Sequence, residues 1–144
     1  MSVRGINHVT IVVRDMTRTA RLFVDALGAR EVYRSSVKEY SRYPEVFLRI
    51  GETWLVVMQD PEVERGRSYD HVAFAIDADD VDVLRERLLV AGAEVVPSRP
   101  RIEAEAQSIY FYDFDSHLFE LHTGDLSDRL RRYAERQVAQ ETSA

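Results

Sequence analysis

Hydrophobic residues follow two periods along the chain, and the same change of period occurs twice. Alternating apolar positions, which are typical of strands, occur in HVTIVV from His8 and again in HVAFAI from His71. Each strand pattern leads into an acidic residue and then into apolar positions spaced as on one helix face. These faces are Met16, Ala20, Phe23 and Leu27 in the first half and Val81, Leu84, Leu88 and Ala91 in the second. Gly-Ala and a Val-ending strand follow both helices, which indicates two copies of one unit.

Acidic residues and glycines mark the ends of both predicted helices. Asp15 is placed to cap the first helix and Asp79 or Asp80 the second, because a carboxylate accepts hydrogen bonds from the free N–H groups of a first turn. Gly28 and Gly92 follow the last apolar position of each helix, where a positive φ is least costly for glycine. We therefore expect the helices to end at these glycines.

Additional strands follow each predicted helix. They are VFLRI and TWLVVM in the first half, and SIYFYDF and HLFELH in the second, joined by a turn with Asp113, Asp115 and Ser116. This order predicts an α+β fold of two β-α-β-β-β repeats, forming a cup-shaped mixed sheet with helices on its outer face. We expect one domain over residues 1–144, with repeats at about 4–60 and 68–123 and a C-terminal helix at about 125–140.

Alternation also divides the side chains of each strand between two faces. One face is apolar and is expected to pack against the helices: Val9, Ile11, Val13, Val46, Leu48, Ile50, Leu55, Val57, Val72, Phe74, Ile76, Ile109, Phe111, Phe119 and Leu121. The opposite face has a different chemistry and is expected to line the cup: His8, Thr10, Glu45, Phe47, Trp54, Met58, His71, Ala73, Tyr110, Tyr112, Leu118, Glu120 and His122.

Glu120 stands out because a carboxylate in an apolar strand is costly to bury unless a cation compensates it. His8 and His71, the first strand residue of each repeat, share its face. Two imidazoles and a carboxylate suit a divalent first-row metal and leave coordination positions for water and substrate. For each residue alone, the alternative is a hydrogen-bonded core side chain. His117, in the hairpin turn, is expected to be structural, and His122 to lie beside the metal site or at its rim.

Composition narrows the function classes further. The chain has 144 residues and a net charge of -6 with mixed signs, so it lacks the clustered basic footprint of a nucleic-acid-binding protein. It has no cysteine, which excludes disulfides, cysteine zinc sites and a thiol nucleophile, and which is consistent with a cytoplasmic location. The apolar N-terminal stretch is too short for a signal sequence or a membrane span. Nucleotide-binding, serine-hydrolase and zincin motifs are absent from the sequence.

The paired repeats with His8, His71 and Glu120 resemble the vicinal oxygen chelate superfamily, which includes glyoxalase I, extradiol dioxygenases and fosfomycin-resistance proteins. The segments RSYDHVAFAID and RPRIEAEAQSIYFYDFDSHLFELHTG, with L-x-x-R-L at 126–130, are most similar to the FosX-type fosfomycin epoxide hydrolases of that superfamily. The resemblance implies a homodimer in which His8 of one chain completes a metal site with His71 and Glu120 of the other.

The resemblance also implies a role for each site residue. A divalent metal, Mn²⁺, would bind a phosphonate oxygen and the oxirane oxygen of fosfomycin and act as a Lewis acid. Glu45, in SRYPEVFLRI, matches the glutamate that activates water in these hydrolases. Further residues match positions that line or hold the substrate: Trp54, Tyr69, Ser108, Tyr110 and Arg129. A guanidinium fork such as that of Arg129 suits a phosphonate dianion.

One loop departs from the hydrolase pattern. Where these enzymes read E-G-E-G-R-S, the chain reads E-A-E-A-Q-S, so that Ala104, Ala106 and Gln107 replace two glycines and an arginine. The change removes a cationic partner for a phosphonate and leaves the metal ligands in place. Two alternatives stay open: a thiol transferase or other metalloenzyme acting on another small anionic substrate, and a metal-free drug-binding protein. The bleomycin-binding members that represent the second alternative lack the ligand triad.

Overall fold

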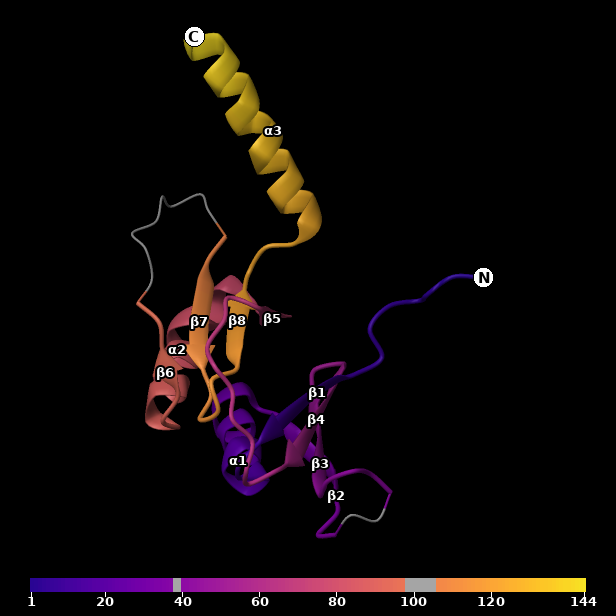
Figure 1. Cartoon of the computed structure of the whole chain (residues 1–144). Coiled ribbons are helices and arrows are strands. Elements are labelled where there is room, and N and C mark those ends of the chain that lie inside the picture. The colour runs from indigo at the N-terminus through magenta and orange to yellow at the C-terminus, as the bar shows by residue number, and fades with distance from the viewer. Residues whose placement is uncertain (38–39, 98–105) are drawn as a thin grey trace.

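The computed structural model describes residues 1–37, 40–97 and 106–144, so Glu103 and Ala104 of the divergent loop lie outside the described residues. Each repeat forms its own four-stranded sheet (Figure 1). The first repeat contains β1 (Val9–Val13), α1 (Met16–Leu27), β2 (Arg30–Arg34), β3 (Glu45–Ile50) and β4 (Thr53–Gln59). The second contains β5 (His71–Ala75), a 3₁₀ turn η1 (Ala78–Asp80), α2 (Val81–Val90), β6 (Glu94–Val95), β7 (Ser108–Tyr112) and β8 (Leu118–His122).

The two sheets have the same topology. Their strand orders are β1-β4-β3-β2 and β5-β8-β7-β6, with the first strand parallel to the last and the other pairs antiparallel. The crossover between the parallel strands includes the helix, as such a connection requires. The predicted α+β fold with two β-α-β-β-β repeats is therefore confirmed, and β1 and β5 occupy equivalent edges of their sheets.

The expected division of strand faces is confirmed by burial. Apolar side chains of the helix-facing set form one core, of which Val9, Ile50, Val72 and Ile76 are the partly buried margin. This core spans both repeats because the ring of Phe23 on α1 meets the ring of Phe119 on β8, with centroids 5.2 Å apart. Nε of Arg14, just after β1, donates to Oδ1 of Asp115 in the second hairpin at 2.8 Å. The repeats are therefore packed together by both apolar and ionic contacts.

The helix ends follow the sequence only in part. Asp15 caps α1 by accepting a hydrogen bond from the backbone N–H of Arg18 at 3.0 Å, and Gly28 ends it with a φ of 67°. The predicted cap of α2 is wrong for Asp80, whose side chain makes no capping bond. The turn η1 runs directly into α2, so Asp80 has helical backbone angles instead of the extended ones that side-chain capping needs.

Replacing Asp15 with alanine is expected to lower the free energy of unfolding by about 1 kcal/mol, because the N–H of Arg18 loses its acceptor. Urea unfolding followed by circular dichroism would measure the change. Asp25→Ala, at an exposed position on the same helix, is the matched control and should leave the unfolding midpoint unchanged or slightly raised. Equal destabilisation by both substitutions would show that the Asp15 cap contributes nothing.

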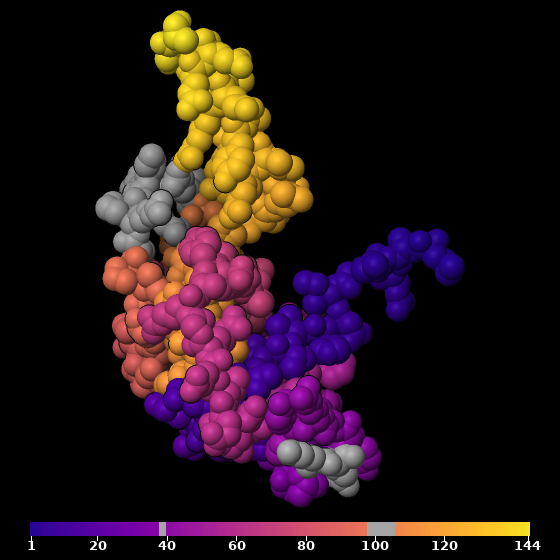
Figure 2. Space-filling view, viewed as in Figure 1, coloured from indigo at the N-terminus to yellow at the C-terminus, as the bar shows by residue number. Residues whose placement is uncertain are grey.

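Helix α3 (Leu126–Ser143) extends away from both sheets (Figures 1 and 2). Asp125 and Asp128 form a capping box at its start, but none of its residues is buried. Three of its apolar side chains, spaced along one side of the helix, are more than half exposed: Leu126, Leu130 and Tyr133. An 18-residue helix with no buried face lacks the packing that normally stabilises helices in water. None of the described helices is long and apolar enough to cross a membrane.

Candidate metal centre

His71 and Glu120 form the nucleus of the candidate site. They come from the adjacent parallel strands β5 and β8, and Nε2 of His71 lies 3.1 Å from Oε2 of Glu120. Glu120 is 5% exposed although it is a carboxylate in an apolar strand. The imidazole of His71 remains partly open to solvent. One wall of the site is therefore buried, and the other can be reached from outside.

Hydrogen bonding at His71 favours a cation between the two side chains. Nδ1 of His71 lies 2.7 Å from the backbone oxygen of Tyr69, which can only accept, so Nδ1 carries a proton. In the neutral ring, Nε2 then directs its lone pair toward Oε2 of Glu120, also an acceptor. Two facing acceptors are unfavourable unless a proton or a metal ion lies between them. A metal-binding histidine typically donates its other ring N–H to an oxygen in this way.

The surroundings of Glu120 keep it in the form that binds metals. Burial raises the pKa of this carboxyl, but the Ser108 hydrogen bond, the His122 and His71 imidazoles and the Tyr110 hydroxyl together hold the pKa below its usual value. Ser108 Oγ donates to Oε1 of Glu120 at 2.7 Å. Burial and the hydrogen bond with Tyr69 raise the pKa of Tyr110, so its hydroxyl stays protonated. The site therefore combines an anionic carboxylate with neutral donors.

His8 lies on the other sheet. It directly precedes β1, its Nδ1 is 2.7 Å from Oδ1 of Asn7, and its ring centroid is 4.5 Å from that of Trp54. Within the described residues, no group of three or more His, Cys, Asp or Glu side chains is close enough to hold a metal. The chain thus brings His71 and Glu120 together but leaves His8 apart from them. Strand alternation assigns each residue to a face but does not say which sheet meets which.

Glu45 and Trp54 lie with His8 on the first sheet. Glu45 begins β3 and is 7% exposed. Within the described residues, no hydrogen bond or ion pair joins its carboxylate to the rest of the protein. The ring centroid of Phe47, two residues along the same strand, lies 5.1 Å from the ring centroid of Trp54. The indole N–H of Trp54 is buried without a hydrogen-bond partner among the described residues. A buried carboxylate and a buried donor, both lacking partners in the described chain, are typical of a surface that receives a ligand.

The other predicted substrate residues gather around His71 and Glu120. The ring centroids of Tyr69 and Tyr110 lie 5.2 and 5.3 Å from the ring centroid of His71. Ser108 contacts Glu120 directly, as described above. Arg129, in the first turn of α3, places Nη2 3.3 Å from Nε2 of His122. Trp54 is the exception, since it belongs to the first sheet.

The two remaining histidines differ in role. His117 is buried in the hairpin turn, where Nδ1 lies 2.8 Å from Oδ2 of Asp113, as expected of a structural residue. His122 contacts Ser108, Glu120 and Arg129, so it lies beside the candidate metal ligands, which is one of the two places expected for it. Its place on the same strand face as Glu120 was the only sequence signal for this role.

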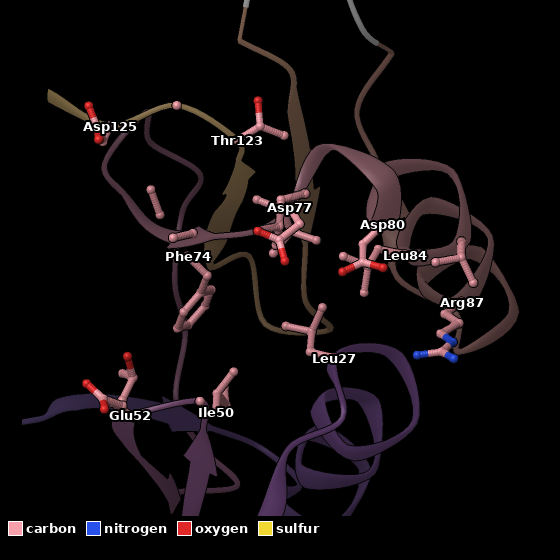
Figure 3. A pocket seen from close by; sticks show the side chains of 18 of the residues that line it. Leu27, Ile50, Glu52, Phe74, Asp77, Asp80, Leu84, Arg87, Thr123 and Asp125 are labelled. Carbon is pink, nitrogen blue, oxygen red and sulfur yellow. The ribbon is translucent and has the colours of Figure 1, made fainter. Parts of the chain in front are cut away.

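A cavity of about 750 Å³ lies elsewhere, at the junction of the repeats (Figure 3). Its wall combines apolar groups such as Leu27, Ile50 and Phe74 with acidic ones such as Asp77 and Asp80. None of the nine predicted site residues lines it. The candidate metal centre is therefore an open sheet face and not this cavity.

Paired β-α-β-β-β repeats with a histidine–glutamate pair on one sheet define a protein of the vicinal oxygen chelate class. The family model for the Glyoxalase/Bleomycin resistance protein/Dioxygenase superfamily matches residues 5–121. The chain belongs to this superfamily, and within it to the family of FosX fosfomycin resistance proteins.

Three relatives illustrate the similarity. Fosfomycin resistance protein FosX of Mesorhizobium japonicum is 46% identical over 132 residues, covering 92% of this chain and 94% of that protein. FosX of Listeria monocytogenes is 41% identical over 133 residues, which cover 92% of this chain and 99% of that protein. A glutamate-to-glutamine mutant of the Listeria protein was solved with Mn(II) and 1S,2S-dihydroxypropylphosphonic acid, and its structure is similar to this one with a TM-score of 0.79. The two sequences are 39% identical, and the match covers 92% of this chain and 99% of that chain.

Proposed function

We propose that this protein is a metal-dependent epoxide hydrolase that opens the oxirane of fosfomycin, or of a related small anionic epoxide, by adding water, and so confers fosfomycin resistance. The facing acceptors of His71 and Glu120 carry the proposal, because a cation between them resolves their repulsion. The relative solved with Mn(II) and a dihydroxypropylphosphonic acid supports it, since that diol is what water addition to fosfomycin would give.

The residues present fit a divalent metal such as Mn²⁺. His71 and Glu120 would supply one nitrogen and one carboxylate, and His8 a second nitrogen, because its Nδ1 is engaged by Asn7 and its Nε2 is left to bind. A bound divalent ion supplies Lewis acidity toward the epoxide oxygen. Mixed N/O ligand sets of this size suit several first-row ions, and Mn²⁺ is the ion found with the relatives.

Glu45 is proposed as the general base that takes a proton from the attacking water. Its buried carboxylate, without a partner in the described chain, is available for this role. Arg129 would hold the phosphonate, as a guanidinium matches its charge and geometry. The remaining proposed substrate contacts are Trp54, Tyr69, Ser108 and Tyr110. The indole N–H of Trp54 has no partner among the described residues and is available as a neutral donor.

We further propose a homodimer whose metal sites are shared between chains. Three observations support it: His8 and Glu45 lie on one sheet and His71 and Glu120 on the other, β1 and β5 are sheet edges, and α3 exposes an apolar stripe. Such a stripe and two open edges are typical of a surface that meets a second subunit. A cytoplasmic location stays a prediction.

Phosphorus NMR of fosfomycin incubated with the Mn²⁺-loaded protein tests the reaction. We expect the diol to form without any added thiol, because Glu45 is placed to activate water and the chain has no cysteine nucleophile. A parallel sample with glutathione distinguishes the thiol-transferase alternative, whose adduct has a separate resonance. Product only with thiol would replace hydrolysis by thiol transfer. No turnover by folded, metal-loaded protein in either sample would refute fosfomycin as substrate and implicate the Ala106–Gln107 change in the loop.

A further inference from the structure

We infer that Arg129 and His122 act as positioning residues that orient the metal-binding carboxylate through Ser108. This inference rests on the proposed metal site. Four side chains from β7, β8 and α3 form a series in which each lies within hydrogen-bond distance of the next. Nη2 of Arg129 is 3.3 Å from Nε2 of His122, whose Nδ1 is 2.8 Å from Oγ of Ser108, which is 2.7 Å from Oε1 of Glu120.

Donor and acceptor chemistry fixes the direction of each hydrogen bond in this series. Arg129 has only donors, so Nε2 of His122 must accept and carries no proton. Nδ1 of His122 must then carry the ring proton, which agrees with its position 3.2 Å from the Glu120 carboxylate, a pure acceptor. Nδ1–H donates to the oxygen of Ser108, and the Ser108 hydroxyl donates to Oε1 of Glu120. Every link therefore points from the arginine toward the carboxylate.

The consequence is a defined orientation of Glu120. Its Oε1 is held by Ser108, while Oε2 faces Nε2 of His71 on the side where the metal would bind. Fixing one oxygen prevents the carboxylate from rotating into other arrangements, which preorganises the ligand. Because Arg129 belongs to α3, the same series of hydrogen bonds connects the position of this helix to the candidate metal centre.

The arrangement also distinguishes Arg129 from its neighbours on α3. Arg131 forms an ion pair with Asp128 at 3.0 Å, and Nε of Arg132 donates to the backbone oxygen of Asp128. Nη2 of Arg129 instead lies 3.3 Å from Nε2 of His122. A residue that only held a phosphonate would have no effect on the imidazole or on metal affinity before substrate binds.

The first experiment measures the tautomer of His122 in metal-free protein. The chain has four histidines, so long-range ¹H–¹⁵N spectra of ¹⁵N-histidine-labelled protein can be assigned with single substitutions. We expect the Nδ1–H tautomer of His122 in the wild type and in the control Arg131→Ala, and a loss of that preference in Arg129→Ala. An Nε2–H tautomer in the wild type, or no response to Arg129→Ala, would overturn the inference. This outcome does not depend on whether fosfomycin is turned over.

The second experiment measures Mn²⁺ affinity by electron paramagnetic resonance of the free ion. His122→Asn keeps an N–H on the atom that replaces Nδ1, whereas His122→Gln loses it. We expect affinity within a few fold of wild type for H122N and weaker by ~10–100-fold for H122Q, the usual cost of losing a group that orients a metal ligand. Arg129→Ala should weaken binding and Arg131→Ala should not. Equal affinity of both His122 variants and the wild type would refute the positioning role, whereas no Mn²⁺ binding by the wild type would refute the metal site itself.

Discussion

Glu45→Gln is expected to lower fosfomycin hydration by ~10²–10⁴-fold while leaving Mn²⁺ affinity nearly unchanged, since losing a general base removes proton transfer without removing a metal ligand. The substitution conserves shape at a buried position. At this strand end the backbone N–H of Glu45 donates to the hydroxyl of Ser35, and the backbone N–H of Ser35 donates to the backbone oxygen of Glu45. Both bonds use the backbone of residue 45, so glutamine retains them. Steady-state hydration by phosphorus NMR and Mn²⁺ titration would be compared on the same preparation.

Glu52→Gln serves as the matched control, because Glu52 is exposed in the turn between β3 and β4 of the same sheet and carries the same charge. It should hydrate fosfomycin at the wild-type rate. If Glu45→Gln kept full hydration, Glu45 would not be the base. If it lost Mn²⁺ binding in parallel with hydration, its effect would be on the metal site and not on proton transfer.

Much of the fold could be predicted from sequence because its determinants are local. Strand alternation identifies which side of each strand is buried, and residues such as Val13, Leu55 and Phe111 are fully enclosed as expected. Asp15 and Gly28 act at their own helix ends, so their roles follow from neighbouring residues alone. Asp80 shows the limit, since the 3₁₀ turn before it sets its backbone angles and removes its capping role.

The candidate site depends on contacts between distant segments, and here the sequence was less informative. It identified His71 and Glu120, which adjacent strands bring together. It also placed His8 on the same type of face, but it could not show that His8 lies on a separate sheet. The contact of Arg129 with His122 depends on how α3 leaves β8, which no periodicity encodes. The residues of the site could therefore be predicted from the sequence, but the contacts between them could not.

Mixing two inactive variants is expected to restore activity if the metal site is shared between chains. His8→Ala and Glu120→Gln should each abolish hydration, because each homodimer then lacks one ligand type at both sites. In a mixed dimer, the chain with intact Glu120 meets the chain with intact His8, so one of the two sites is complete. With random exchange half of the dimers are mixed, and about a quarter of wild-type activity should return.

The pairing of His8→Ala with Glu45→Gln provides the decisive control. Both residues lie on the first sheet, so in a shared site each mixed dimer has one site without His8 and one without Glu45, and no site is complete. Co-expression with two affinity tags would isolate the mixed dimers for phosphorus NMR. Recovery by the first mixture alone requires that the two sheets of one site come from different chains. If neither mixture recovers although mixed dimers form, a single chain must supply all three ligands, and the separation of His8 from His71 and Glu120 must then close within that chain when the metal binds.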